Sequence, residues 1–98
     1  MVRHVVSWNF KPEVPEEKRP EVAQLLKSRM DALPALIPCL EKSEFFIGPK
    51  GLSNCDLALY AEIDAQENLV VYRDHPEHQA VVKIIREFCC ERRCTDLI

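Results

Sequence analysis

The chain has 98 residues, of which 47% are hydrophobic and 30% are charged. This length and composition fit one globular domain over residues 1–98 and exclude a disordered or fibrous chain. The formal net charge of -3 argues against nucleic acid or an anionic membrane as a partner. No apolar stretch approaches the roughly 18 residues of a membrane span, and no signal-peptide profile is present. We therefore expect a cytoplasmic location.

The first predicted element is a strand from Val2 to Phe10, because its residues alternate in hydrophobicity. A helix follows, and because proline fits only a first helical turn, Pro20 means that the helix either begins near Arg19 or is kinked there. The apolar face of the strand carries Val2, His4, Val6, Trp8 and Phe10, and the predicted apolar stripe of the helix carries Val22, Leu25, Leu26, Met30 and Leu33.

Two more strands are predicted, at about residues 40–47 and at Asp56–Ile63, with a loop between them at residues 48–54. The alternation in the third strand places four residues on one apolar face: Leu57, Leu59, Ala61 and Ile63. The run of apolar residues from Phe45 to Ile47 leaves the facing of the second strand open.

Two helix starts are predicted from capping patterns. Asp64 and Glu67 fit a capping box before a short helix that includes Tyr72. Asp74 before Pro76 repeats the device and starts a second helical segment. The apolar stripe of this segment is formed by Val81, Val82, Ile85 and Phe88. The tail, residues 91–98, has the right length for a last strand.

The predicted order of elements is strand, helix, strand, strand, helix, strand. This order is typical of the α+β, ferredoxin-like split βαβ fold, with a four-stranded antiparallel sheet and helices on one face. The open face would carry Val5, Ala58 and Tyr60 and would need a cover. Because so short a chain has little apolar surface to spare, we expect a homodimer in which two sheets meet through their open faces.

Helical spacing predicts that His78 points toward the sheet, where the helices also cover His4. Tyr72, six residues before His78, is placed to reach the same interior. An imidazole and a phenol together can remove a proton and hold an oxyanion near neutral pH without a cofactor or metal. Two alternatives stay open: the histidines are structural core residues, or a metal is held by His4, His75 and His78, which requires His75 to turn inward.

The chain has five cysteines, namely Cys39, Cys55, Cys89, Cys90 and Cys94. An odd number without a secretion signal favours reduced thiols. No C-x-x-C motif occurs, and the spacing of Cys90 and Cys94 lacks the second ligand pair of a structural zinc site. Arg92 and Arg93 would lower the pKa of the Cys94 thiol and make it reactive, or else Cys94 is a small buried hydrophobe, which is the interpretation we favour.

Three segments carry a family likeness: R-H-V-V-S-W-N-F-K at residues 3–11, L-P-A-L-I-P at residues 33–38 and Y-R-D-H-P-E-H at residues 72–78. With them the chain resembles the stress-responsive dimeric α/β-barrel (Dabb) family over nearly its whole length. The resemblance implies a ferredoxin-like dimer whose two sheets close into a barrel, a dimeric α/β barrel.

Plant polyketide cyclases of the olivetolic acid type are similar to this family and close a ring by aldol-type chemistry without metal or cofactor. The resemblance implies that His78 is the catalytic histidine, Tyr72 the catalytic tyrosine and His4 the histidine of the first strand. Those cyclases carry another histidine near the start of the third strand, where this sequence has Asp56 and Leu57.

The sequence thus predicts a homodimer with a small-molecule pocket in which His78, Tyr72 and His4 perform cofactor-free acid-base chemistry on a carbonyl compound. The outcome would be that of a cyclase, lyase or isomerase. The alternative is a non-catalytic stress-response or accessory dimer with structural histidines. The expected partners are a second copy of the chain and an unknown small molecule.

Overall fold

The computed structural model describes residues 1–48 and 52–98. Its helices and strands are, in chain order, β1 (Val2–Phe10), the 3-10 turn Glu16–Lys18, α1 (Arg19–Ala32), the 3-10 turn Leu33–Ala35, β2 (Leu40–Ile47), β3 (Leu57–Ile63), the 3-10 turn Gln66–Asn68, α2 (Leu69–Asp74), α3 (Pro76–Phe88) and β4 (Cys89–Leu97). The order confirms the predicted α+β, ferredoxin-like fold. Residues 49–51 of the predicted loop lie outside the described residues.

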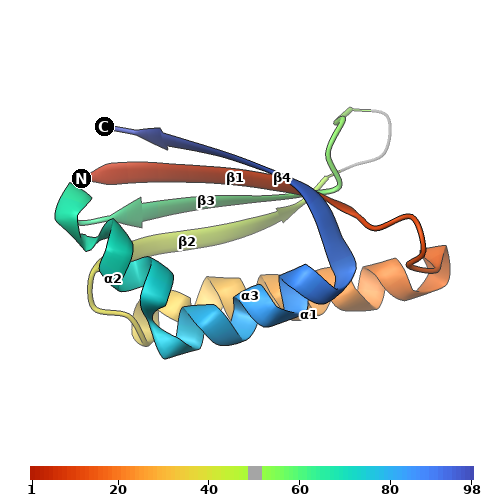
Figure 1. The fold of residues 1–98 in the computed structure, drawn as a ribbon, viewed down its shortest axis with the longest axis horizontal. Helices are drawn as coiled ribbons and strands as arrows, with labels where there is room; N and C mark the ends of the chain where they lie inside the picture. The colour runs from red at the N-terminus through yellow and green to blue at the C-terminus, as the bar shows by residue number, and fades with distance from the viewer. Residues whose placement is uncertain (49–51) are drawn as a thin grey trace.

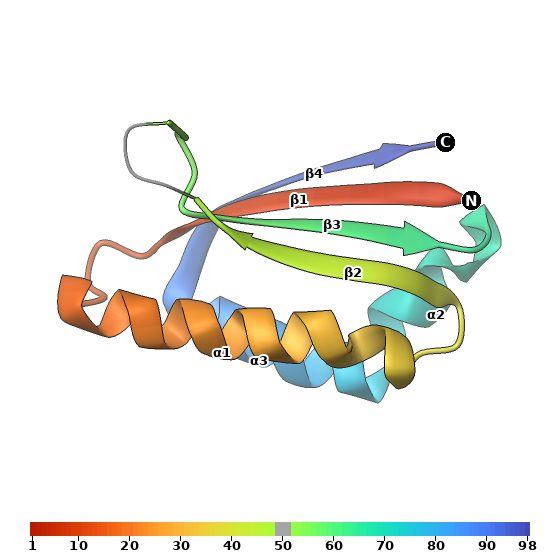
Figure 2. The same cartoon turned by 180° about the vertical axis from the view of Figure 1, so that it is seen from behind.

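The four strands form one antiparallel sheet in the order β2-β3-β1-β4. All helices lie on one side of it: α1 and α3 run side by side beneath the strands, and α2 lies at the end where β1 begins (Figure 1). Within residues 1–48 and 52–98, the opposite side of the sheet carries no helix, as the view from behind shows (Figure 2). No helix of the described chain has the length and apolar character of a membrane span.

The core lies between the helices and the sheet, and it contains the predicted apolar faces of β1 and β3. In β2, Phe45 is fully buried whereas Phe46 is 45% exposed, which settles the facing of that strand. The predicted stripe of α1 is wrong at Leu25, which is 44% exposed. Leu25 is turned about 100° around the helix from the buried Leu26 and so lies on the flank of the helical stripe.

The predicted capping residues are both wrong. Asp64 makes no cap: its Oδ1 accepts a hydrogen bond from the side chain of Asn68 at 2.8 Å. The cap of α3 is His75, whose Nδ1 accepts from the Glu77 N–H at 3.1 Å, and not Asp74. An imidazole nitrogen satisfies a free helix N–H as a carboxylate does, so the residue types alone do not choose between neighbours.

β4 is longer than predicted, because it begins at Cys89 directly after α3. The pairing of β1 with β4 shifts at Trp8, where two residues of β4, Glu91 and Arg92, lie opposite this one residue of β1. Glu91 has φ of 53°, in the left-handed region that favours glycine. The strand therefore contains a β-bulge built on a non-glycine residue.

The bulge decides which side of β4 faces the helices. Since side chains alternate along a strand, one inserted residue moves all later side chains to the other face. Cys89 is buried on the helix side before the bulge. After it, Cys94 pairs with Val6 and Asp96 pairs with His4, both helix-facing partners. Unbroken alternation from Cys89 would turn these two side chains away.

Two side chains of α1 occupy the outer edge of β2. Asp31 Oδ1 accepts the Phe45 N–H at 2.8 Å, and Lys27 Nζ donates to the Phe45 carbonyl at 2.9 Å. Lys27 and Asp31 also form an ion pair at 3.0 Å. Unpaired groups of an edge strand invite pairing with another chain, so this clamp closes the edge at Phe45.

We expect Asp31→Ala to lower the free energy of unfolding by about 1 to 2 kcal/mol, because a charge-assisted hydrogen bond to the backbone is lost. Asp31→Asn keeps an acceptor oxygen for the Phe45 N–H and should lose clearly less. Urea unfolding at one fixed protein concentration measures both changes. Equal losses would show that the bond to Phe45 contributes little.

Candidate active site

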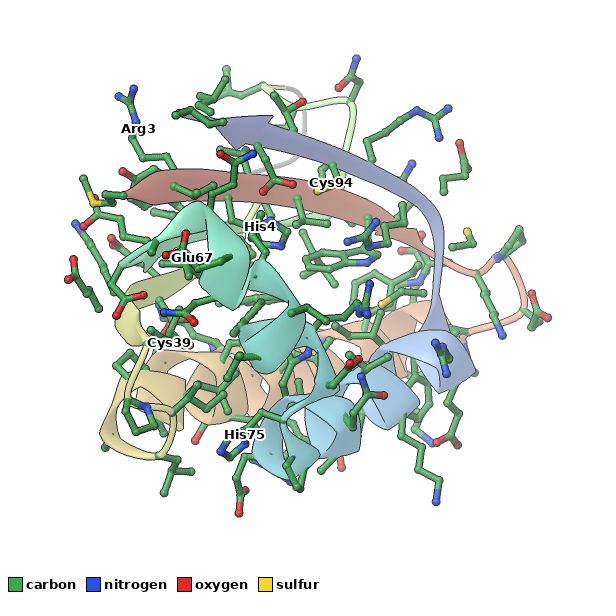
Figure 3. The ribbon with its side chains drawn as sticks, turned by 60° about the vertical axis from the view of Figure 1, so that its left-hand side comes forward. Arg3, His4, Cys39, Glu67, His75 and Cys94 are labelled. Atoms are coloured by element: carbon green, nitrogen blue, oxygen red, sulfur yellow. The ribbon has the colours of Figure 1, made fainter. Side chains whose placement is uncertain are left out.

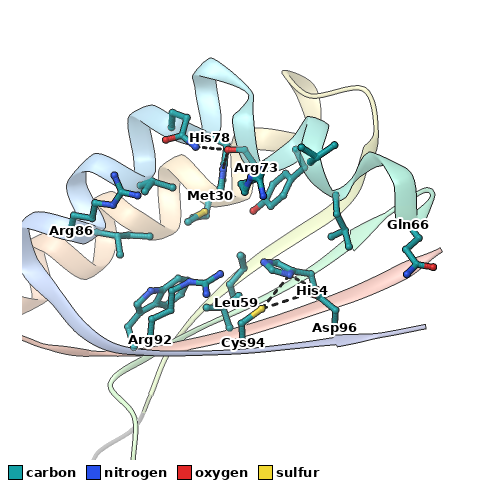
Figure 4. A pocket seen from close by; sticks show the side chains of 18 of the residues that line it. His4, Met30, Leu59, Gln66, Arg73, His78, Arg86, Arg92, Cys94 and Asp96 are labelled. Atoms are coloured by element: carbon teal, nitrogen blue, oxygen red, sulfur yellow. Dashed lines mark hydrogen bonds and ion pairs between the residues drawn. The ribbon is translucent and has the colours of Figure 1, made fainter.

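A pocket of about 770 Å³ lies between the helix-facing side of the sheet and the helices α2 and α3. Apolar side chains form much of its wall, among them Val6, Met30, Leu59, Val82 and Ile85. All three predicted site residues, His4, Tyr72 and His78, line it. In the close view, His78 approaches from the helices and His4 from the sheet, and both reach into the same space (Figure 4).

The three rings form a row with Tyr72 in the middle. The Tyr72 ring centroid lies 4.2 Å from that of His78, with the planes tilted, and 5.8 Å from that of His4 in an edge contact. Tyr72 comes from α2, His78 from α3 and His4 from β1. The break between α2 and α3 lets these two helices direct Tyr72 and His78 to one place.

His75 does not join this row. Its Nδ1 caps α3, and its side chain lies at the outer surface, away from His4 (Figure 3). The predicted alternative of a metal site at His4, His75 and His78 is therefore wrong. A different group, His4 with Cys94 and Asp96, has its ligand atoms within 4.8 Å of one another. It is already held together by its own hydrogen bonds.

Asp96 is a site residue that the sequence did not predict. Its Oδ1 lies 2.5 Å from Nδ1 of His4, and the Cys94 Sγ lies 3.7 Å from the same nitrogen. Because a carboxylate accepts, the bond places the proton of a neutral His4 on Nδ1 and leaves Nε2 with the lone pair. Only the left-handed bulge at Glu91 turns Asp96 to this side, and no residue pattern signals a bulge without glycine.

His78 is held in one tautomer by the backbone. Its Nδ1 lies 2.9 Å from the carbonyl oxygen of Arg73, which can only accept, so Nδ1 carries the proton and Nε2 the lone pair. Burial lowers the pKa of His78, with smaller contributions from the charges of His4 and Arg92, while the Arg73 carbonyl opposes the shift. His78 is therefore a neutral imidazole at neutral pH, with its basic nitrogen unprotonated.

Tyr72 is held neutral by the same cause. Burial raises the pKa of Tyr72 far above its ordinary value, although the charge of Arg92 opposes the shift. Only 2% of Tyr72 is exposed, and its hydroxyl has no hydrogen-bond partner within residues 1–48 and 52–98. The same holds for the indole Nε1 of Trp8. Both residues line the pocket, and both can donate to a bound oxygen.

The cysteines differ from the favoured interpretation at one position. All five thiols are free in the described chain, and Cys39 and Cys89 are buried, but Cys94 is exposed. Partial desolvation and then the charge of Asp96 raise the pKa of Cys94, against the lowering effect of Arg92. The alternative of a reactive Cys94 with a lowered pKa is therefore wrong, because desolvation and then the Asp96 carboxylate together outweigh the effect of Arg92 on the pKa.

The fold and the pocket define a small ferredoxin-like domain with an open sheet face. Residues 2–98 match the model of the Stress responsive A/B Barrel Domain, and the chain belongs to this family, Dabb. None of the curated proteins compared with the chain matches it.

Solved structures share the architecture. A dimeric ferredoxin-like protein of unknown function from Bacteroides fragilis NCTC 9343 is 33% identical, over 98% of this chain and 93% of that one, with a TM-score of 0.90. A dimeric ferredoxin-like protein from Thermobifida fusca YX is 28% identical, over 98% and 88%, with a TM-score of 0.78. Hydroxynitrile lyase from Passiflora edulis is 14% identical, over 99% and 91%, with a TM-score of 0.73, and shares the fold.

The hydroxyl of Tyr72, unpaired within the described residues, predicts how its removal changes the free energy of unfolding. A buried hydroxyl without a partner costs about 1 to 3 kcal/mol, so Tyr72→Phe should leave the free energy of unfolding unchanged or raise it by about 1 kcal/mol. Tyr60→Phe is the matched control, because its hydroxyl donates to Glu62 at 2.7 Å. Calorimetric unfolding measures both, and marked destabilisation by Tyr72→Phe would assign that hydroxyl a structural partner.

The lowered pKa of His78 predicts a pH dependence of stability. As pH falls, the unfolded chain binds a proton at His78 near the reference pKa of about 6.5, before the folded chain does. Stability is therefore lost from about pH 6.5 down to the lower pKa of the folded state. His78→Gln should remove this part of the pH profile. An imidazole that titrates above about 6.5 in an NMR titration of the folded protein would contradict the assignment.

Proposed function

We propose that this Dabb protein is a homodimer that performs cofactor-free acid-base chemistry on a small carbonyl compound, with His78 as the base. The observation that supports it is the pocket in which the ring centroids of His78 and Tyr72 lie 4.2 Å apart. One offers a free basic nitrogen and the other a hydroxyl without a partner in the described chain. An open cavity that touches all of His4, Tyr72 and His78 is what a catalytic role requires and what a close-packed structural role does not produce.

The proposed step begins with a carbonyl oxygen at the Tyr72 hydroxyl. Nε2 of His78 takes a proton from the carbon next to the carbonyl group, the C–H bond breaks, and its electron pair forms the enolate. Tyr72 O–H donates a hydrogen bond to the enolate oxygen and stabilises the charge that develops there. In a cyclase the enolate carbon then bonds to the carbon of a second carbonyl group, the π bond of that group breaks, and its oxygen takes the proton from Nε2 of His78. In an isomerase the enolate takes the proton back from His78 at another carbon. A lyase runs the carbon–carbon bond step in reverse.

His4 assists in two ways in this proposal. Its edge contact holds the Tyr72 ring at the centre of the row, and in the neutral form of His4 the bond to Asp96 keeps the proton on Nδ1 and the lone pair on Nε2. Nε2 is then free to accept a proton released on the sheet side of the pocket. Asp96 is a positioning residue, because it acts through His4.

We further infer that the dimer forms through the helix-free face of the sheet. That face carries exposed apolar side chains, of which Val5 is 36%, Phe46 45% and Leu97 44% exposed. The similar proteins from Bacteroides fragilis and Thermobifida fusca are described as dimeric. A cytoplasmic location without a nucleic-acid partner is part of the proposal and is supported by the net charge of -3.

Proton removal can be tested before the natural substrate is known. The protein should accelerate the exchange of the α-protons of an aryl ketone such as propiophenone for deuterium in D₂O, followed by ¹H NMR. His78→Ala should lower the accelerated rate by about 100- to 10,000-fold, the usual contribution of a general base. The matched control is Gln79→Ala, because Gln79 donates to the same Arg73 oxygen but has no basic nitrogen.

Sedimentation at micromolar concentration should give a dimer for the wild type and both variants, and a monomer of 11.3 kDa would contradict the proposed architecture. Exchange that survives in His78→Ala would remove His78 as the base. Suppose instead that His78→Ala and Gln79→Ala lower the melting temperature by the same amount and that the wild type exchanges the α-protons of no ketone. The histidine is then structural, and the accessory dimer is the correct interpretation.

A further inference from the structure

The pocket contains a cation that the acid-base mechanism does not use. Arg92 lines it from β4, and Figure 4 shows Arg86 and Arg92 at one end of the pocket, with Gln66 and Asp96 at the other. The charge of Arg92 acts on both Tyr72 and His78, which places it close to the row of rings. No ion pair within residues 1–48 and 52–98 involves Arg92.

Trp8 adds a neutral donor beside this cation. Trp8 is the β1 residue that faces the bulge, so its side chain and that of Arg92 are cross-strand neighbours on the helix side. The indole is 5% exposed, and Nε1 has no hydrogen-bond partner in the described part of the chain. An indole N–H donates and never accepts, so this position is complementary to a ligand oxygen.

We propose that the pocket takes an oxo acid: Arg92 and the Trp8 N–H bind its carboxylate, while its carbonyl oxygen faces Tyr72. A guanidinium fork and one N–H match the two oxygens of a carboxylate. The apolar wall, which includes Val6, Leu59 and Ile85, suits a hydrocarbon or aromatic body between the two polar groups. The place of the carbonyl group rests on the proposed function, whereas the binding of the carboxylate does not.

The carboxylates of the pocket do not offset this preference at Arg92. Asp96 is engaged by His4 at 2.5 Å and lies at the opposite end of the pocket from Arg92 in Figure 4. Glu67 comes from the 3-10 turn before α2, whereas Arg86 adds a second cation at the Arg92 end. The pocket is thus polarised along its length, and an anionic ligand has one preferred orientation.

Isothermal titration calorimetry with benzoylpropionate, its methyl ester and phenylbutyrate tests the assignment. The wild type should bind benzoylpropionate at least about tenfold more tightly than the ester. Arg92→Gln should weaken binding of the acid roughly 10- to 100-fold and leave binding of the ester within about twofold, and Arg92→Lys should restore part of the loss. Trp8→Phe should weaken binding of both acids. The matched control is Arg29→Gln, because Arg29 lies in the last turn of α1 and is not among the described residues that line the pocket.

Equal affinity for acid and ester, no binding of the acid at millimolar concentration, or displacement of the acid by equimolar inorganic phosphate would each overturn the proposal. Failure of the proposed catalysis is distinguishable from these outcomes. His78→Ala should bind phenylbutyrate, which has no keto group to react, as the wild type does. Binding that depends on Arg92 without any α-proton exchange would support the carboxylate site and contradict the acid-base mechanism.

Discussion

The β-bulge at Glu91 is the constraint on which the rest of the site depends. The strand leaves α3 with Cys89 buried, and the extra residue then places Arg92, Cys94 and Asp96 on the helix side. A left-handed φ at a non-glycine residue costs about 1 to 2 kcal/mol. It persists because paired residues on both sides of the bulge fix the backbone there. The bulge at Glu91 thus brings Arg92 into the pocket and Asp96 next to His4.

Burial shifts the pKa values of His78 and Tyr72 in opposite directions, and both shifts favour the neutral side chain. Desolvation disfavours whichever form is charged, so the same low-polarity wall lowers the pKa of His78 and raises the pKa of Tyr72. Both side chains are therefore neutral at neutral pH. A neutral base beside a neutral donor is the pairing that proton removal next to a carbonyl group needs. It also leaves the Tyr72 hydroxyl buried without a partner in the described chain, which lowers stability.

The periodic features of the chain were predictable, and the local exceptions were not. The alternation in β1 and the helical spacing of His78 placed His4, Tyr72 and His78 at one pocket, because both patterns depend only on backbone geometry. The choice of His75 as the cap depends on side-chain competition between neighbours. The role of Asp96 depends on a bulge that no glycine announces. In the sequence Arg92 lies two residues from Cys94, and only the register across β1 reveals that its neighbour in space is Trp8.

The two edges of the sheet explain why a second copy is expected at its face. The edge at β2 is closed at Phe45 by Asp31 and Lys27. The edge at β4 carries charged residues along its exposed part, which disfavour strand addition. The helix side is filled by the core and the pocket. Of the surfaces of the sheet, the helix-free face remains, with Val5 and Phe46 exposed on it. A chain of 98 residues can commit one face of a single sheet to a pocket when a second copy covers the other face, as in the proposed dimer.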